Sequence, residues 1–353
     1  MLRAAMALIA VAVAPHWTRT DIPVPKAHPD LFVVSRGVNA HGAAIYEGTF
    51  RQKGSLHQVS YLWRNGRLTL LTVGSAPWVD VWAINSSGTV AGDAGARAVV
   101  WRNGRPTVLA AEPSTAQRIN DHGTVIGVDD RRAAMWRDGS ETLLDGVATV
   151  TALNEQDAVI GETPFPGGLA HAMLWQDGTT TDLGTVGVAA SWATDISDDG
   201  TIVGYLANQL DFPLTAVEWK DGQLVDLGRF GALGAEAVAV NDAGDVLVQL
   251  TDANGDPSAI VLLRDGNPIT VPGVVARTVD EQGQVLGYTT TAAHGRRSFV
   301  WQDGVETLLP TSDGPSPPWG GPTGVAGAFA VGDEYVSLGK GRNTSHAVLW
   351  SKR

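Results

Sequence analysis

The stretch INDHGTVIGVDDRRAAMWRDG, residues 119–139, contains the two short motifs that recur along this 353-residue chain. The first motif is an aliphatic residue, Asn or Asp, two polar residues, Gly, any residue, an aliphatic residue, any residue and Gly. The second is a strand-like segment that ends in Trp and is followed by a Gly-containing turn. Asn, Asp and Gly tolerate the positive φ of tight hairpin turns, so both motifs predict short antiparallel strands.

Both motifs recur throughout the sequence. The first begins at Ile84, Ile119, Leu153, Ile196, Val240 and Val279, with degenerate copies at Val38 and Val331. The second ends at Trp63, Trp101, Trp136, Trp175, Trp219, Trp301 and Trp350, with Leu263 in the remaining position. A third apolar segment follows each turn. The mean spacing of about 42 residues is that of a four-stranded propeller blade.

The pattern therefore predicts an all-β fold, a β-propeller of about eight four-stranded blades, with seven if a degenerate copy is not a blade. We expect each Trp to fill the space between blades, where its burial stabilises by roughly 2–3 kcal/mol. Alternate residues of a strand share a face, so the residue three before the Trp points the other way. That residue is small and would let the next blade approach: Ser60, Ala98, Ala133, Ala172, Ala216, Ser298 and Ala347.

The two ends of the chain predict ring closure. The last copy ends at Trp350 with three residues remaining, whereas TDIP at Thr20 matches the final blade segment TDLG at Thr181. An N-terminal strand that completes the last blade would leave no open sheet edge. We accordingly divide the chain into a signal-peptide-like segment, 1–14, and a single propeller domain, 15–353.

Composition limits the partners and the compartment. The formal net charge is −12 and there is no Cys, so we expect no nucleic-acid partner and no thiolate chemistry. Residues 1–14 contain one Arg, an apolar run and small residues, the layout of a secretory signal. The run is too short for a permanent membrane span. We expect an exported monomer, extracellular or in the cell envelope; an apolar first strand or a misplaced start is the other interpretation of the segment.

The repeats resemble a known family. HAMLWQDGTTTDLGTVG at His171 and HAVLW at His346 are similar to the HAF-type repeat of predicted extracellular bacterial proteins, over about residues 38–350. The resemblance implies a secreted or surface repeat protein without an assigned reaction. The leading His is present only in these two copies, so a role specific to His would be confined to two blades.

The sequence shows no established catalytic motif: a nucleophile elbow, HExxH, a P-loop and GxGxxG are all missing. The one metal-like string is DANGD, Asp252 to Asp256, whose alternating oxygen donors would suit Ca²⁺. Pro257 follows where a calcium loop needs Gly, so we favour an ordinary hairpin turn. We expect no metal, no cofactor and no catalytic residue.

Two groups of residues are candidates for ligand binding. Four Trp lie outside the repeat position and near one loop face: Trp78, Trp82, Trp192 and Trp319. Exposed aromatic rings there could stack on sugars or prolines, although burial is the commoner state of a Trp. The second group would form a basic arc four residues before the repeat Trp: Arg97, Arg132, His171, Arg297 and His346. The alternative is that each arginine packs over a neighbouring Trp ring.

These features favour a secreted or cell-surface, non-enzymatic scaffold that binds a protein, peptide or glycan. The alternative is a propeller hydrolase or lyase that acts on a polysaccharide, with carboxylates and His from several blades in the central channel. An inert surface repeat used for adhesion or spacing is a third interpretation.

Overall fold

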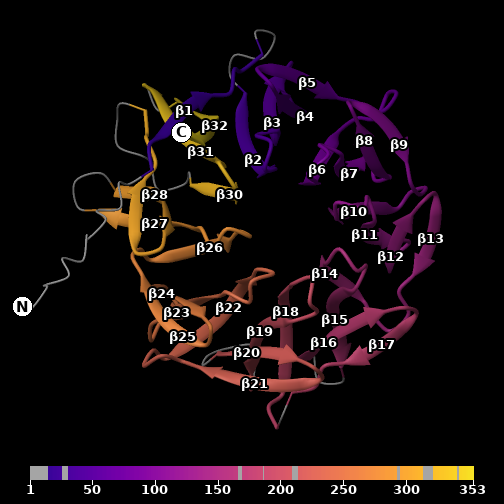
Figure 1. Ribbon diagram of the computed structural model, residues 1–353. Helices are drawn as coiled ribbons and strands as arrows, with labels where there is room; N and C mark the ends of the chain where they lie inside the picture. The colour runs from indigo at the N-terminus through magenta and orange to yellow at the C-terminus, as the bar shows by residue number, and fades with distance from the viewer. Residues whose placement is uncertain are drawn as a thin grey trace, which may run out of the picture.

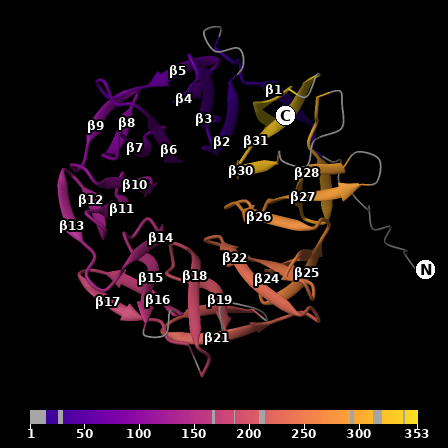
Figure 2. The ribbon, with the colours of Figure 1, turned by 180° about the vertical axis from the view of Figure 1, so that it is seen from behind.

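The computed structural model describes residues 15–25, 31–165, 169–185, 187–208, 214–291, 295–312, 321–339 and 342–353. These residues form eight four-stranded antiparallel sheets, and none of them lies in a helix. The sheets surround a common axis like the blades of a propeller (Figure 1), and the ring is closed when seen from behind (Figure 2). The prediction of an all-β propeller with eight blades is confirmed. The signal-like segment 1–14 and Trp319 lie outside the described residues.

Seven blades are continuous in sequence, with strands in order from the axis outward (Figure 1). Blades 1 to 3 are β2–β5 (Phe32–Val38, Ala44–Gln52, Ser55–Arg64, Arg67–Leu71), β6–β9 (Val79–Ile84, Val90–Ala94, Ala98–Arg102, Arg105–Val108) and β10–β13 (Ser114–Ile119, Val125–Asp129, Arg132–Arg137, Ser140–Leu143). Blades 4 and 5 are β14–β17 (Thr149–Leu153, Val159–Phe165, Leu169–Gln176, Thr179–Asp182) and β18–β21 (Ala190–Ile196, Ile202–Ala207, Thr215–Lys220, Gln223–Gly228). Blades 6 and 7 are β22–β25 (Gly234–Val240, Val246–Thr251, Pro257–Arg264, Asn267–Val271) and β26–β29 (Val275–Val279, Val285–Thr291, Gly295–Gln302, Val305–Leu308).

Blade 8 joins the two ends of the chain. It contains β30 (Pro322–Ala326), β31 (Phe329–Gly339), β32 (Arg342–Lys352) and, outermost, β1 (Trp17–Asp21). β1 pairs antiparallel with β32, so that Trp17 lies opposite Lys352 and Thr20 opposite Leu349. The predicted closure by the N-terminal strand is confirmed.

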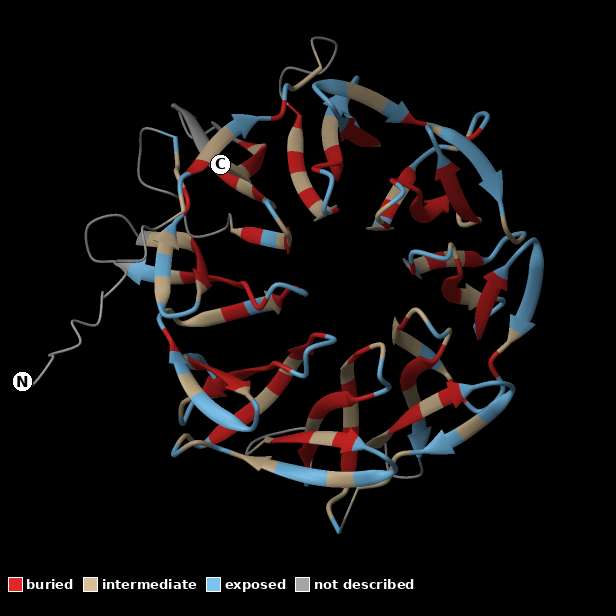
Figure 3. Cartoon of the chain, viewed as in Figure 1, coloured by how far each residue is buried: buried red, intermediate tan, exposed pale blue. Residues whose placement is uncertain are grey.

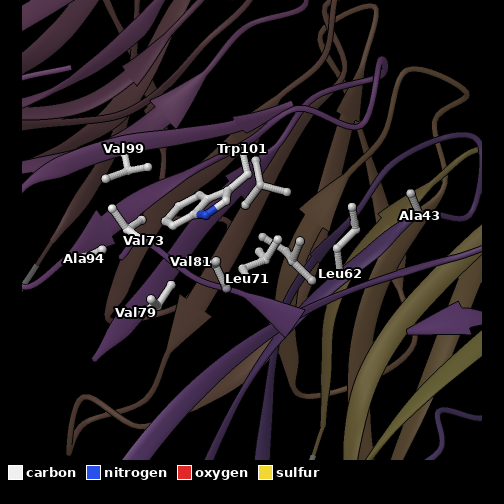
Figure 4. Close-up of a cluster of buried hydrophobic side chains, with 11 residues drawn as sticks. Ala43, Leu62, Leu71, Val73, Val79, Val81, Ala94, Val99 and Trp101 are labelled. Carbon is white, nitrogen blue, oxygen red and sulfur yellow. The ribbon is translucent and has the colours of Figure 1, made fainter. Parts of the chain in front are cut away.

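The repeat tryptophans hold neighbouring blades together. Trp101 is fully buried and packs with Leu62, Leu71 and Val73 of the preceding blade (Figure 4). The other repeat tryptophans and Leu263 are also buried, each in a separate apolar cluster that spans two blades: Trp63, Trp136, Trp175, Trp219, Trp301 and Trp350. The core is therefore divided among the contacts between adjacent blades rather than gathered at one centre.

The alternation of side chains along the third strand is also as predicted. Val99 and Trp101 face blade 1, whereas Ala98 and Val100 contact the cluster around Trp136 of blade 3. Ala98 has no exposed surface. A small residue at this position thus lets the Trp of the next blade approach.

The last Gly of the first motif lies on the second strand, opposite a β-bulge in the inner strand. In blade 2 the register between β6 and β7 shifts at Trp82, and Gly92 pairs with Val81 beside the shift. A Cβ on Gly92 would lie 2.0 Å from the main-chain oxygen of Asp80. Gly127, Gly161 and Gly204 have the same contact, at 1.9–2.0 Å. Only Gly fits here unless the bulge opens.

The outermost strands are the most exposed part of each blade (Figure 3); all four residues of β9 are exposed. Within the described part of the chain there is no helix long and apolar enough to cross a membrane.

Candidate functional site

The ring has two faces that differ in chemistry. On one, which we call the asparagine face, the first and second strands of blades 1 to 7 connect through the turn of the first motif, Asn-x-x-Gly or a close variant of it. In blade 8 this turn is formed by Gly327 and Ala328 instead, and the degenerate copy expected at Val331 lies within β31. On the other, the aromatic face, the second and third strands connect and the chain passes into the next blade. Of the candidate tryptophans in the described part of the chain, Trp82 and Trp192 lie on the inner strands β6 and β18, and Trp78 lies on the segment that enters β6 from the aromatic face.

The motif Asn residues connect one blade to the next. Asn120 accepts the N–H of Thr124 at its Oδ1 atom (2.9 Å) and donates from Nδ2 to the main-chain oxygen of Asn154 (3.0 Å). Four other residues donate in the same way to the next blade, over 2.9–3.0 Å: Asn39, Asn85, Asn154 and Asn241. Since these side chains are buried, the Asn is a structural residue.

Acidic residues beside the motif Asn form a second connection. Asp121 accepts the N–H of Ser86 in blade 2 (2.7 Å), and its own N–H is accepted by Glu155 of blade 4 (2.8 Å). The series continues through Asp198, Asp242 and Glu281, over 2.7–2.9 Å. These five carboxylates therefore have hydrogen-bond partners in the neighbouring blade.

Carboxylates on the first and second strands, one buried and two half-buried, also link neighbouring blades. Glu47 accepts the N–H of Val81 (3.0 Å), and Asp333 accepts the N–H of Ser35 (2.6 Å). Burial raises the pKa of Asp333 to about 6, against the opposing effect of its hydrogen bonds to Ser35 and of nearby Arg36. Asp195 also has its pKa raised by burial to about 6, although it accepts two backbone N–H groups. These acids hold backbone donors of the blades in place.

On the aromatic face, Trp78 and Trp82 of blade 2 remain 40% and 38% exposed. The Trp82 indole donates to Asp93 (2.8 Å), and the guanidinium of Arg36 lies over the ring, 4.9 Å from its centroid. Arg36 in turn pairs with Glu47 over 2.6 Å. One ring face of Trp82 is thus covered by a cation.

Asp93 is the most perturbed acid of this group. It is only 5% exposed, and burial raises its pKa to about 6; the indole hydrogen bond lowers the pKa, and the neighbouring carboxylates Asp80 and Glu47 raise it. Asp80 accepts a hydrogen bond from Gln58 and also has a pKa raised by burial. Two titratable groups therefore gather beside an exposed aromatic ring.

Trp192 is half-buried on β18 of blade 5 and stacks on Tyr205 of β19, with ring centroids 5.1 Å apart. Burial, then the charges of Glu236 and Glu162, raise the pKa of Tyr205 to about 12. Tyr205, Glu162 and Glu236 were not among the sequence candidates. The position after the motif Gly, which Tyr205 occupies, is the signal that could have identified it.

The predicted basic row lies at the aromatic face, where the third strands begin. Three of its members contact carboxylates: Arg97 with Glu112 (3.8 Å), Arg132 with Asp145 (2.9 Å) and His171 with Asp182 (2.9 Å). Arg297 donates to the main-chain oxygen of Leu309 (3.5 Å). His346 is half-buried on β32, opposite Glu334. None of the described cation–π pairs joins these residues to a repeat Trp.

The calcium-like string forms a hairpin turn. The N–H groups of Asn254 and Asp256 both donate to Oδ1 of Asp252 (2.8 and 3.0 Å). In the described ranges, no three His, Asp or Glu residues are placed to hold a metal ion.

Comparison with known proteins identifies the architecture. The structure is similar to Porphyromonas gingivalis dipeptidyl peptidase 4, covering 85% of this chain and 55% of that chain at 12% identity, with a TM-score of 0.57. It is also similar to Pyrococcus horikoshii acylaminoacyl peptidase, covering 86% and 57% at 12% identity, with a TM-score of 0.51. This likeness shows the fold alone.

The chain spans little more than half the length of either peptidase. No family model and no curated protein sequence matches it. The HAF-type resemblance stays a prediction from the repeat residues.

Proposed function

We propose that the protein is a non-enzymatic binding scaffold whose aromatic face binds a protein, peptide or glycan. The observation that carries this proposal is the exposure of Trp78 and Trp82 together on blade 2. Large aromatic side chains contribute strongly to binding, because a ligand that covers them removes apolar surface from water. Leu56 and Leu233, 65% and 57% exposed near the same face, add apolar surface.

The use of the polar residues supports a scaffold. The motif Asn and the acidic residues beside them form hydrogen bonds between blades. The carboxylates of Glu47, Asp195 and Asp333 accept backbone N–H groups of neighbouring blades. These groups stabilise the ring, whereas the exposed ring surfaces of Trp78 and Trp82 are free to contact a ligand.

Export belongs to the same proposal. The signal-like residues 1–14 and the resemblance to extracellular repeat proteins favour a location outside the cytoplasm, at the cell surface or in the medium. The absence of Cys fits a fold that is held by eight interfaces between blades and needs no disulfide.

A pair of double variants tests the proposal. Glycan and peptide arrays are probed with the full chain, with W78A/W82A and with the control L70A/L308A. Leu70 and Leu308 are 47% and 42% exposed but lie on the outermost strands β5 and β29. We expect W78A/W82A to lose at least tenfold in affinity for the strongest array ligand, and the control to stay within twofold. Equal losses in both variants, or none in W78A/W82A, would refute the assignment; circular dichroism confirms that each variant is folded.

A polysaccharide hydrolase or lyase is the second candidate, because Asp93 and Asp80, both with raised pKa values, lie beside Trp82. A carboxyl group with a pKa of about 6 is suited to general acid catalysis. The wild-type chain and D93N are incubated with polysaccharides that bind on the array, and new reducing or unsaturated ends are measured. Release of ends by the wild type and not by D93N would favour the enzyme; no release by either favours the scaffold.

A further inference from the structure

An aromatic pair on blade 5 lies between two acidic residues from neighbouring blades. Trp192 and Tyr205 stack with an interplanar angle of 19°. Glu162 is on β15 of blade 4, and Glu236 is on β22 of blade 6. Both β15 and β22 contact β18, and the charges of both glutamates act on the Tyr205 hydroxyl. Residues from three consecutive blades therefore meet at this point.

Among the described residues, no cation pairs with either glutamate. Neither side chain forms a hydrogen bond or an ion pair with any residue in the described ranges. Burial raises the pKa of Glu162 and of Glu236. Half-buried carboxylates are commonly paired, because an unpaired charge loses hydration without gaining a partner. In the described part of the chain, the site therefore holds two half-buried carboxylates without a protein partner.

Other blades contain the cation that blade 5 lacks. Tyr288 of blade 7 follows the motif Gly as Tyr205 does, and the guanidinium of Arg296 lies 4.0 Å from its ring centroid. In blade 2, Arg36 lies over Trp82 and pairs with Glu47. Each of these aromatic positions on the inner wall holds a guanidinium from the chain itself. Blade 5 offers an aromatic ring and carboxylates in the same setting, with the guanidinium missing.

We propose that the blade-5 site, defined by Glu162, Trp192, Tyr205 and Glu236, binds a cationic arginyl or lysyl side chain of a peptide or protein ligand. The ligand's charge would lie against the aromatic rings and between the carboxylates, as Arg36 does at Trp82. The net charge of −12 favours approach of a basic partner. This inference rests on the proposed binding function and specifies the partner as a basic polypeptide.

The test uses the peptide acetyl-Gly-Arg-Gly-amide and its uncharged citrulline counterpart as probes of the full chain. Titration is followed by NMR of ¹⁵N-labelled Trp indoles, with W192F assigning the Trp192 signal. We expect the arginine peptide to shift that signal in a saturable way and the citrulline peptide to bind at least fivefold more weakly. Similar binding of both peptides, or no shift, would overturn the proposal.

The isosteric double variant E162Q/E236Q removes both charges and keeps the side-chain volumes. It should bind the arginine peptide at least fivefold more weakly than the wild type. D221N is the control, since Asp221 is an exposed turn residue of the same blade on the asparagine face, and it should bind within twofold of the wild type. If D221N loses as much affinity for the arginine peptide as E162Q/E236Q does, the binding reflects general charge attraction and the site is wrong. Undiminished affinity in E162Q/E236Q would also refute the site.

The outcomes separate this inference from the proposed function. If W78A/W82A loses array binding while the arginine peptide fails to bind blade 5, the scaffold proposal stands and the cation site is wrong. If the arginine peptide binds blade 5 while W78A/W82A binds the array ligand as tightly as the wild type, the cation site stands and the assigned binding surface is wrong. A glycan as the sole array ligand, indifferent to E162Q/E236Q, also contradicts the cation site.

Discussion

Replacement of Asn120 by Ala should remove one of the links between blades 3 and 4. The Asn120 side chain, 4% exposed, accepts the N–H of Thr124 (2.9 Å) and donates to Asn154 O (3.0 Å) and Asp157 Oδ1 (2.9 Å). Each hydrogen bond contributes about 1 kcal/mol net, and two buried backbone groups would lose their side-chain partner. We therefore expect the free energy of unfolding of N120A to fall by about 3 kcal/mol.

Equilibrium urea unfolding, followed by Trp fluorescence and far-UV circular dichroism, measures this change. The matched control is N267A, because Asn267 is exposed and its side chain donates only to Asp265 O (3.1 Å). An exposed substitution of this kind alters stability by about 0.5 kcal/mol or less. If N120A is no less stable than N267A, the structural role assigned to the motif Asn is wrong.

Three further predictions concern the fold and its pH dependence. G92A should lower the free energy of unfolding by about 3 kcal/mol or more, because its Cβ would lie 2.0 Å from a main-chain oxygen. The control G324A, whose Cβ would have no atom nearer than 3.8 Å, should unfold near the wild-type urea midpoint. W17A should lower the free energy of unfolding by about 3–5 kcal/mol, because Trp17 is buried on the strand that closes blade 8. The exposed W78A should lower it by less than about 1 kcal/mol, and urea unfolding measures both. Burial raises the pKa of Asp93 from 3.8 to about 6, so the folded protein favours the protonated carboxyl group. The stability that the protonated group contributes is complete below about pH 4 and is lost as the pH rises to about 6. Between pH 4 and pH 8, the free energy of unfolding of D93N, measured in urea, should therefore rise by about 2 kcal/mol relative to that of the wild type.

The architecture could be predicted because the sequence repeats the same information eight times. Seven of the eight copies carry a Trp with a small residue three positions before it, so a degenerate copy does not obscure the pattern. Leu263 shows this: it stands in a Trp position and is buried in the equivalent cluster. The closing strand was predictable for the same reason, since TDIP at Thr20 is a copy of a segment found inside other blades.

The contacts of the candidate site could not be predicted from the same pattern. Each inner strand contains a bulge, at Arg36 in blade 1 and Trp82 in blade 2, and the extra residue breaks the two-residue alternation of side chains. Which residues of the inner wall meet then depends on the bulge and on blade packing. Glu162 follows the motif Gly of its blade as Tyr205 does, but Glu162 and Glu236 are separated by a whole blade in sequence and the motif does not show that they meet at Tyr205.

The claim that ligands bind on the aromatic face is tested most directly by hydrogen–deuterium exchange of the full chain with and without its strongest array ligand. We expect slowed exchange in the segments that enter and form β6 and β18, around Trp78 and Trp192, with the Asn-x-x-Gly turns and outermost strands unchanged. Protection confined to those turns, or to the outermost strands, would contradict the account.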